Sequence, residues 1–261
     1  MIDKKLFVVG VGPGDPELIT LKAVNTLIKS DFIFYPNVCG GKNKIAYDII
    51  KNAFKFACVP DFAEERLIPL KVEMKRSSGR NKDLYNENAV KIIEKLKEGV
   101  CSYVTLGDPM FYSTYWGIYN AIKETLNSVI YEKEKESGKI DIIIINGVSS
   151  FNYSLGLIVE PFIIKNSSVL ISVPVKKDFA EIKKEIKFIA DKFPKPQIIA
   201  FMKAGGYVKE ILKAFKELCD KELEDGMLKL YLIEKSMLIE NFTERKELNF
   251  DYFSIFIGVF L

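Results

Sequence analysis

The sequence predicts an α/β protein made of two domains, and three observations support this prediction. Short apolar, strand-like runs alternate with segments whose apolar residues recur at helical spacing, as in twisted, mostly parallel sheets covered by helices. The chain has 261 residues, which is long for one core and suits one large or two ordinary α/β domains. Its composition, 48% hydrophobic and 28% charged, is that of a globular protein.

The alternation is clearest in the first half of the chain. Strands are predicted at 6–9, 32–35, 104–106 and 142–145, and helices at 21–28, 86–98 and 114–126. Thr20 is expected to cap the first helix, and Gly99 to end the second.

The second half repeats the class of fold but not the sequence. Strands are expected at 169–173, 198–201, 230–233 and 253–260, and helices at 179–193 and 207–219. We place the boundary after Gly147, where NGVSSFNYSLGL passes from a strand end into a new helix. The predicted domains are therefore residues 1–147 and 148–261, and the absence of a Pro/Gly/Ser-rich linker predicts that they touch along a tight seam.

Charge, hydropathy and residue usage narrow the function classes. A formal charge of +3 is too small to predict binding to nucleic acid or to a membrane surface, and no apolar run is long enough to span a bilayer. The N-terminal residues do not resemble a signal peptide. The chain has no histidine, which removes the commonest acid/base and the commonest metal ligand, so we expect no protein-bound metal. The cysteines lack CxxC spacing and predict a reduced, cytoplasmic protein: Cys39, Cys58, Cys101 and Cys219.

The stretch VVGVGPGDPELIT, residues 8–20, is a strand followed by a glycine-rich turn and a capped helix. It is not a dinucleotide fingerprint, because Asp15 stands where the third glycine of GxGxxG would fall, and no Gly-Lys-Ser/Thr of a phosphate-binding loop follows. The turn could bring backbone N–H groups close to a ligand, or it could be a tight connection without one. The local pattern favours neither reading.

Three further strand-like runs also end in small or polar residues. In VTLGDPMFYST, residues 104–114, Gly107 would let a ligand reach the backbone, although Asp108 could equally be an ordinary helix cap. IINGVSSF, residues 144–151, and AFMKAGG, residues 200–206, repeat the pattern. Ligands of open α/β sheets bind at the carboxyl ends of strands, so the four turns together predict one ligand cleft.

Three of the four arginines, Arg66, Arg76 and Arg80, fall within RLIPLKVEMKRSSGR, beside Lys71 and Lys75. Arginine suits the recognition of carboxylate or phosphate, so an anionic ligand is one hypothesis. A solvated basic loop is the other, and the more common, explanation.

In their order and spacing these motifs resemble the tetrapyrrole methylases, the S-adenosylmethionine-dependent enzymes of corrinoid and sirohaem synthesis. The resemblance runs from VGVGPGDPELITLKA through TLGDPMFYST, NGVSSF and AFMKAGG to LIEKSMLIENFTE and DYFSIFIGVFL, essentially the whole chain. GDP followed by Tyr-Ser-Thr, with PLKVEMKR upstream, looks most like the branch that methylates C-20 of precorrin-2 or cobalt-factor II in cobalamin synthesis. In one departure, Asn146 stands where the family usually has proline, which predicts a slightly looser turn.

The resemblance implies two α/β domains with the methyl donor between them, a tetrapyrrole substrate and a homodimer. Carried over by position, the implied donor-binding residues are Leu106, Gly107, Asp108, Phe111, Ser113, Thr114, Ser149, Ser150, Met202, Lys203, Ala204, Met237 and Leu238. The implied substrate-binding residues are Pro13, Gly14, Lys75, Arg76 and Tyr112. Asp108, or water, could remove the C-20 proton.

Methyl transfer from a sulfonium needs no enzyme-made electrophile, and alignment of the reacting atoms can supply on the order of 7–11 kcal/mol. A site without histidine fits that chemistry. Two alternatives stay open: another methylase of the same fold, acting on a different corrinoid position, on diphthine or on rRNA ribose, or a non-catalytic α/β module that binds an anion or a nucleotide. Saturable binding of S-adenosylhomocysteine would separate the enzymes from the module.

Overall fold

The computed structural model describes residues 4–38, 44–59, 63–73, 80–132, 140–159, 165–192, 195–235, 237–239, 242–244 and 250–261. Within this part the chain divides into two compact units, residues 1–150 and 151–261. The division falls after Ser150, whereas the sequence places the boundary after Gly147. The helix α5 (Ser150–Ile158) begins at the last residue of the first unit.

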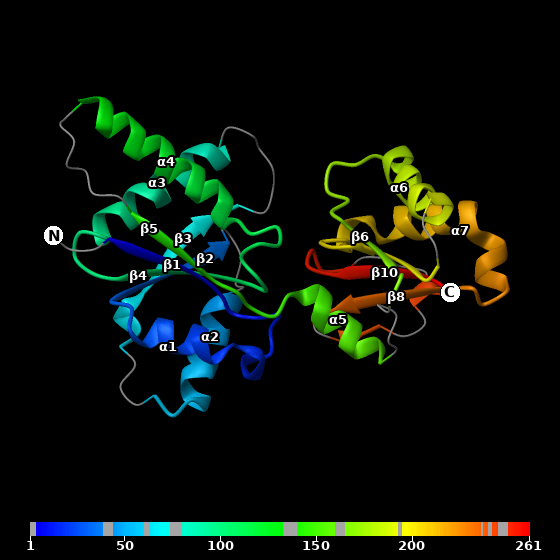
Figure 1. Cartoon of the computed structure of the whole chain (residues 1–261), viewed down its shortest axis with the longest axis horizontal. Coiled ribbons are helices and arrows are strands. Elements are labelled where there is room, and N and C mark those ends of the chain that lie inside the picture. The colour runs from blue at the N-terminus through cyan, green and yellow to red at the C-terminus, as the bar shows by residue number, and fades with distance from the viewer. Residues whose placement is uncertain are drawn as a thin grey trace. The chain divides into compact units, whose positions relative to one another are not determined.

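The first unit contains a parallel sheet in the order β3-β2-β4-β1-β5. Its strands are β1 (Lys5–Gly10), β2 (Phe32–Val38), β3 (Leu67–Val72), β4 (Cys101–Thr105) and β5 (Asp141–Ile145). Helices α1 (Leu21–Ile28) and α2 (Ile45–Phe56) cover one face, and α3 (Arg80–Lys95) and α4 (Tyr115–Glu132) cover the other (Figure 1). This arrangement confirms the predicted α/β class.

Buried side chains on both faces explain why the central strands are continuously apolar. Val9, Val104 and Ile145 pack against α1 and α2, whereas Leu6 and Tyr103 pack against α3 and α4. Side chains buried on both faces of the sheet are expected when parallel strands lie between two layers of helices.

The second unit contains a mixed sheet in the order β6-β7-β10-β8-β9. Its strands are β6 (Ser168–Ser172), β7 (Gln197–Phe201), β8 (Leu228–Glu234), β9 (Met237–Leu238) and β10 (Ile255–Phe260). Only β6 and β7 pair in parallel; β10 runs antiparallel to both β7 and β8. Helices α6 (Phe179–Lys192) and α7 (Val208–Glu224) cover one face, and α5 packs on the other (Figure 1).

Several sequence predictions of local structure are confirmed and some are wrong. Thr20 caps α1, since its Oγ1 accepts a hydrogen bond from Ala23 N at 3.1 Å. The helix predicted at 86–98 instead begins at Arg80 and ends at Lys95. The sequence reading missed α2, β3 and β9, and the segment interpreted as a basic loop contains β3.

Arg66 illustrates how the basic segment is used. Its guanidinium donates hydrogen bonds to Leu27 O at 3.0 Å and Ile28 O at 2.9 Å, and also contacts Ser30 O. These carbonyls belong to the carboxyl end of α1 and its following turn, where no further helical turn supplies donors. Arg66 therefore caps a helix, and the anion hypothesis does not apply to it.

Three glycines let the carboxyl ends of β1, β4 and β5 approach one another. A Cβ at Gly10 would lie 2.6 Å from Gly107 O and 2.7 Å from Gly147 N, and a Cβ at Gly147 would also overlap Gly107 O. Real Cβ atoms do not make such contacts with backbone. We call Gly10, Gly107 and Gly147 the glycine junction.

We predict that Gly10→Ala lowers the free energy of unfolding by at least about 1–3 kcal/mol, because a methyl group cannot enter the glycine junction without moving backbone. Urea denaturation followed by circular dichroism measures the change. Gly156→Ala is the control: Gly156 lies in α5 with nothing within 4 Å of its would-be Cβ, and alanine should stabilise that helix by up to about 1 kcal/mol. Equal stability of the two variants would contradict the role given to the junction.

Candidate functional site

The turns that follow β1 and β4 are joined by backbone hydrogen bonds. Gly107 N donates to Gly12 O at 2.7 Å, Gly12 N donates to Gly107 O at 3.3 Å, and Val11 N donates to Thr105 O at 3.0 Å. Gly12 has φ +84° and Gly107 φ +65°, values that L side chains rarely adopt. The pairing brings the turn that contains Pro13 and Gly14 beside the Gly107-Asp108 turn, as the sequence predicted.

Asp108 connects the β4 turn to the end of β5. Its carboxylate is almost buried, with 7% of the residue exposed. Oδ1 accepts a hydrogen bond from Met110 N at 2.8 Å, and Oδ2 accepts from Asn146 Nδ2 at 3.0 Å and Gly147 N at 3.1 Å. Three of the roughly four lone-pair positions of a carboxylate are thereby used within the chain.

These hydrogen bonds change the interpretation of Asp108. A base must present a free lone pair to the proton that it removes. Three of the lone-pair positions of Asp108 accept hydrogen bonds from the protein's own donors, which supports a positioning role for this residue. Its role as a base stays a prediction. At Asn146, where a looser turn was expected, the side-chain amide adds a contact to Asp108 that proline could not make.

The polar side chains after the turn are likewise engaged within the chain. Ser113 Oγ donates to Thr105 Oγ1 at 3.0 Å and accepts from Tyr115 N, the first amide of α4, at 3.1 Å. Thr114 Oγ1 lies 2.9 Å from the Tyr103 hydroxyl. These contacts fix the start of α4, so both hydroxyls have a structural role whether or not a ligand also uses them.

Trp116, the only tryptophan of the chain, fixes the same turn from the other side, because its Nε1–H donates to Pro109 O at 2.9 Å. The sequence did not predict the contact of Trp116, and it drew attention to Asn146 only as a substitution, not as a partner of Asp108. A lone tryptophan seven positions after Pro109 gives no sequence signal of this contact, since the turn that brings them together is not periodic.

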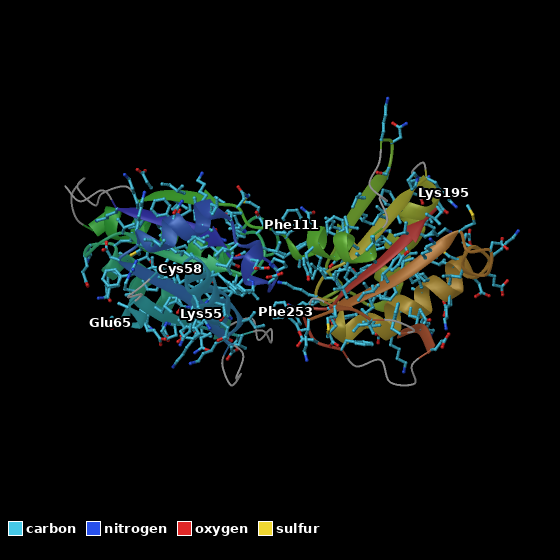
Figure 2. The ribbon with its side chains drawn as sticks, turned by 90° about the horizontal axis from the view of Figure 1, so that it is seen from below. Lys55, Cys58, Glu65, Phe111, Lys195 and Phe253 are labelled. Atoms are coloured by element: carbon cyan, nitrogen blue, oxygen red, sulfur yellow. The ribbon has the colours of Figure 1, made fainter. Side chains whose placement is uncertain are left out.

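Three consecutive apolar side chains of this fixed turn are exposed: Met110, Phe111 and Tyr112. Figure 2 labels Phe111 on the loop that follows β4. Tyr112 has φ +50°, an uncommon conformation for a residue with a side chain. A turn that holds large apolar side chains in solvent while its backbone is tied at several points is suited to contact a ligand with flat, apolar faces.

The β5 turn borders Gly107. A Cβ placed on Gly107 would lie 3.7 Å from Ser150 N and 3.8 Å from Ser149 Cα. Ser149 is buried and Ser150 half-buried. The structure therefore brings together, within the first unit, the predicted residues of three turns: Pro13 and Gly14, Leu106 to Thr114, and Ser149 with Ser150.

The remaining predicted donor contacts lie in the second unit, at one end of the strands of its sheet. Met202 N donates to Ser172 O and Ala204 N to Ser254 O, each at 2.8 Å, so the turn after β7 is anchored on both sides. Between them, Lys203 has φ +57°. The side chains of Met202 and Ala204 are buried, which leaves backbone as the part of this turn that a ligand could meet.

The β8–β9 hairpin contributes the last predicted pair. Leu238 packs in the same apolar cluster as Met202, and Met237, opposite Glu234, is exposed. Glu234 Oε1 accepts a hydrogen bond from Asp251 N at 2.5 Å, and Gly205 lies against the Asp251 carbonyl. These residues follow β7 or belong to β9, and they lie at the same end of the strands of this sheet: Met202, Lys203, Ala204, Met237 and Leu238.

The predicted substrate contacts Lys75 and Arg76 lie outside the described residues. Lys71, on β3, is exposed, and its carbonyl accepts a hydrogen bond from Asn88 Nδ2 at 2.9 Å.

Few described side chains could exchange protons near neutral pH. Burial raises the pKa of Cys101 to about 12 and that of Cys219 to about 11, so both stay protonated thiols. Burial also raises the pKa of the Tyr103 and Tyr115 hydroxyls. In the part of the chain that the structure describes, no group of three or more Cys, Asp or Glu side chains could hold a metal ion, and no helix is long and apolar enough to cross a membrane.

Sequence comparison identifies the family that this fold and these turns define. Residues 5–228 match the profile of the Tetrapyrrole (Corrin/Porphyrin) Methylases. The chain belongs to this family and is a methyltransferase.

One relative resembles the chain over almost its full length. It is the probable cobalt-precorrin-2 C(20)-methyltransferase of Methanocaldococcus jannaschii, 31% identical over 98% of this chain and 94% of the relative.

Two solved structures share the fold. A cobalt precorrin-4 methyltransferase superposes with a TM-score of 0.61 at 17% identity, covering 98% of this chain and 95% of the other. The uroporphyrin-III C-methyltransferase of Thermus thermophilus, complexed with S-adenosylhomocysteine, gives 0.54 at 16% identity, covering 97% and 96%.

We predict that Ser113→Ala lowers the stability of the first unit by about 1 kcal/mol, because the first amide of α4 loses its acceptor. Differential scanning calorimetry should show a fall in Tm of about 2–4 °C. Ser113→Thr keeps the hydroxyl and should retain most of the stability; a Tm loss as large as that of the alanine variant would contradict this assignment.

Proposed function

We propose that the protein transfers a methyl group from S-adenosylmethionine to C-20 of cobalt-precorrin-2 in the synthesis of cobalamin. The observation that carries this proposal is the similarity along almost the whole chain to a probable cobalt-precorrin-2 C(20)-methyltransferase. The tied turns of the first unit support it, since they fix the backbone at the ends of β1 and β4, where Gly107 carries no side chain to hinder a ligand.

The residues present fit this donor. S-adenosylmethionine supplies a methyl group already activated by its sulfonium, and S-adenosylhomocysteine is the product. The protein's task is then to align a carbon nucleophile with that methyl group and to keep water away. In the first unit, the turn that begins at Leu106 and Gly107 and the exposed Phe111 ring can bind the donor. In the second unit, the anchored turn from Met202 to Ala204 stays a separate predicted donor contact.

For the substrate we assign the exposed Tyr112, with Pro13 and Gly14, to the macrocycle. Lys75 and Arg76 are proposed to meet its carboxylates, because charged hydrogen bonds to carboxylates are among the stronger polar contacts. We assign the proton lost from C-20 to water, because three of the roughly four lone-pair positions of Asp108 already accept hydrogen bonds from protein donors. We also propose a homodimer, which size-exclusion chromatography with light scattering would test.

The decisive experiment supplies purified protein with S-adenosylmethionine and, in separate reactions, cobalt-precorrin-2, cobalt-factor II and metal-free precorrin-2. Mass spectrometry should detect one added methyl group in the cobalt-containing product, and NMR should locate it at C-20. Transfer to another carbon would identify a different member of the family, and faster transfer to metal-free precorrin-2 would overturn the choice of the cobalt form. No transfer to any of the three substrates would refute the proposed reaction.

Gly107→Ala should raise the Kd for S-adenosylhomocysteine by at least about tenfold, because the added methyl group would hinder a donor bound against this turn and the positive φ becomes strained. The single tryptophan, Trp116, provides a fluorescence signal from the neighbouring turn for the titration.

The matched control for this prediction is Gly226→Ala. Gly226 has φ +70°, close to that of Gly107, but nothing lies within 4 Å of its would-be Cβ. Both variants should lose about 1–2 kcal/mol of stability from the left-handed conformation, and only Gly107→Ala should lose affinity. Equal donor affinities would remove the Gly107 turn from the donor site.

A further inference from the structure

The nearly buried carboxylate of Asp108 depends on a side chain that is itself exposed. Asp108 is 7% exposed, whereas Asn146, at the end of β5, is exposed to solvent. A buried carboxylate needs hydrogen-bond donors to offset its lost hydration. Two of its donors are backbone amides, of Met110 and Gly147, and the third is Asn146 Nδ2.

We propose that Asn146 is a positioning residue for methyl transfer, acting through Asp108 on the turn from Gly107 to Tyr112. The inference rests on the proposed function for its catalytic consequence, while the hydrogen-bond arrangement itself is independent of it. Among the described residues, Asn146 supplies the side-chain donor to Asp108, and no lysine or arginine forms an ion pair with that carboxylate.

The two carboxylate oxygens hold two different segments. Oδ1 fixes the first residues of the turn through Met110 N, and Oδ2 fixes the β5 end through Asn146 and Gly147. Rotation of the carboxylate would therefore disturb both segments together. Asn146 limits that rotation, because it adds a second donor to Oδ2 besides Gly147 N.

The position of the carboxylate matters for the residues that follow it. Phe111 N donates to Asp108 O at 3.1 Å, so the turn that presents the exposed side chains of Met110, Phe111 and Tyr112 begins at Asp108. A misplacement of about 1 Å at such a turn can lower the rate of a reaction by about a hundredfold when alignment is the main source of catalysis. The amide of Asn146 thus affects the reaction without touching the reacting atoms.

Asn146→Asp tests the proposal because it replaces the amide donor with a carboxyl group at nearly constant shape. When both carboxyl groups are ionised they repel, and the turn should loosen. At lower pH the pair can retain one proton, because two adjacent carboxylates raise one of their pKa values, and the hydrogen bond to Asp108 returns. The parent amide does not titrate, so its behaviour should change little over the same range.

The first readout is amide hydrogen exchange at Met110 and Gly147 in the ligand-free protein, measured by NMR. In Asn146→Asp, exchange should be faster than in the parent at about pH 8, after correction for the intrinsic rate, and close to it at about pH 5. Asn146→Ala should exchange faster at both. The second readout is the Kd for S-adenosylhomocysteine, expected to rise by up to about tenfold in Asn146→Ala, and in Asn146→Asp only at the higher pH.

Asn88→Ala is the matched control. Asn88 is buried, and its Nδ2 donates a hydrogen bond to Lys71 O at 2.9 Å. Lys71 lies on β3, the outer strand of the sheet opposite to β5, which Asn146 follows. Its loss should lower overall stability at least as much as that of Asn146. It should leave the Kd for S-adenosylhomocysteine and the protection of the Met110 and Gly147 amides unchanged, which separates positioning from general destabilisation.

The outcomes separate the two proposals. If the parent binds S-adenosylhomocysteine and both Asn146 variants match it in amide exchange and Kd, the positioning role is overturned. Equal losses in Asn88→Ala would overturn it as well. If the parent does not bind S-adenosylhomocysteine, the proposed function fails, and amide exchange alone decides whether Asn146 positions the turn. In assays of methyl transfer, kcat is expected to fall in Asn146→Ala and the tetrapyrrole KM to rise with it, because Tyr112 lies on the same turn.

Discussion

The close approach of backbone at the glycine junction is the constraint on which the site depends. At Gly10 and Gly147 the space that a Cβ would need is filled by backbone of the neighbouring strand ends, including the carbonyl oxygen of Gly107. The backbones of these strand ends are therefore in contact. The turns after β1 and β4 are close enough to form hydrogen bonds with each other. The paired Gly12 and Gly107, and the carboxylate of Asp108 that reaches the end of β5, follow from that geometry.

The chemistry proposed for the chain suits such a backbone-built site. A methyl group carried by a sulfonium needs alignment and exclusion of water more than proton transfer. The hydroxyls of Ser113 and Thr114, predicted to bind the donor, and the Asp108 carboxylate, predicted as a possible base, all form hydrogen bonds that fix the turn. A chain without histidine can therefore carry a well-defined site, because its polar groups determine shape and leave the reactivity to the bound molecules.

The sequence predicts the turns well and their partners poorly. Strand ends rich in glycine are local signals, and so is a threonine before an apolar helical run, which is why the four turns and the Thr20 cap were found. The contacts of Asp108 with Asn146 and of Trp116 with Pro109 could not be predicted, because the spacing of these residues in the sequence follows neither the helix nor the strand repeat. The strand β3 was missed although it alternates: Leu70 and Val72 are buried and Lys71 between them is exposed. The charged residues around it led to the interpretation of the whole segment as a basic loop.

The Asn146-Gly147 pair has a consequence for the chemical ageing of the protein. An asparagine followed by glycine deamidates readily, because the backbone nitrogen of the glycine can rotate into position and attack the carbonyl carbon of the asparagine side chain. Here the Gly147 nitrogen donates a hydrogen bond to Asp108, and Gly147 packs against Gly10 and Gly107. The rotation that deamidation needs would therefore require the strand ends to separate. The fold thus protects a labile peptide unit by immobilising it, and the lifetime of Asn146 becomes linked to how often this part of the sheet opens.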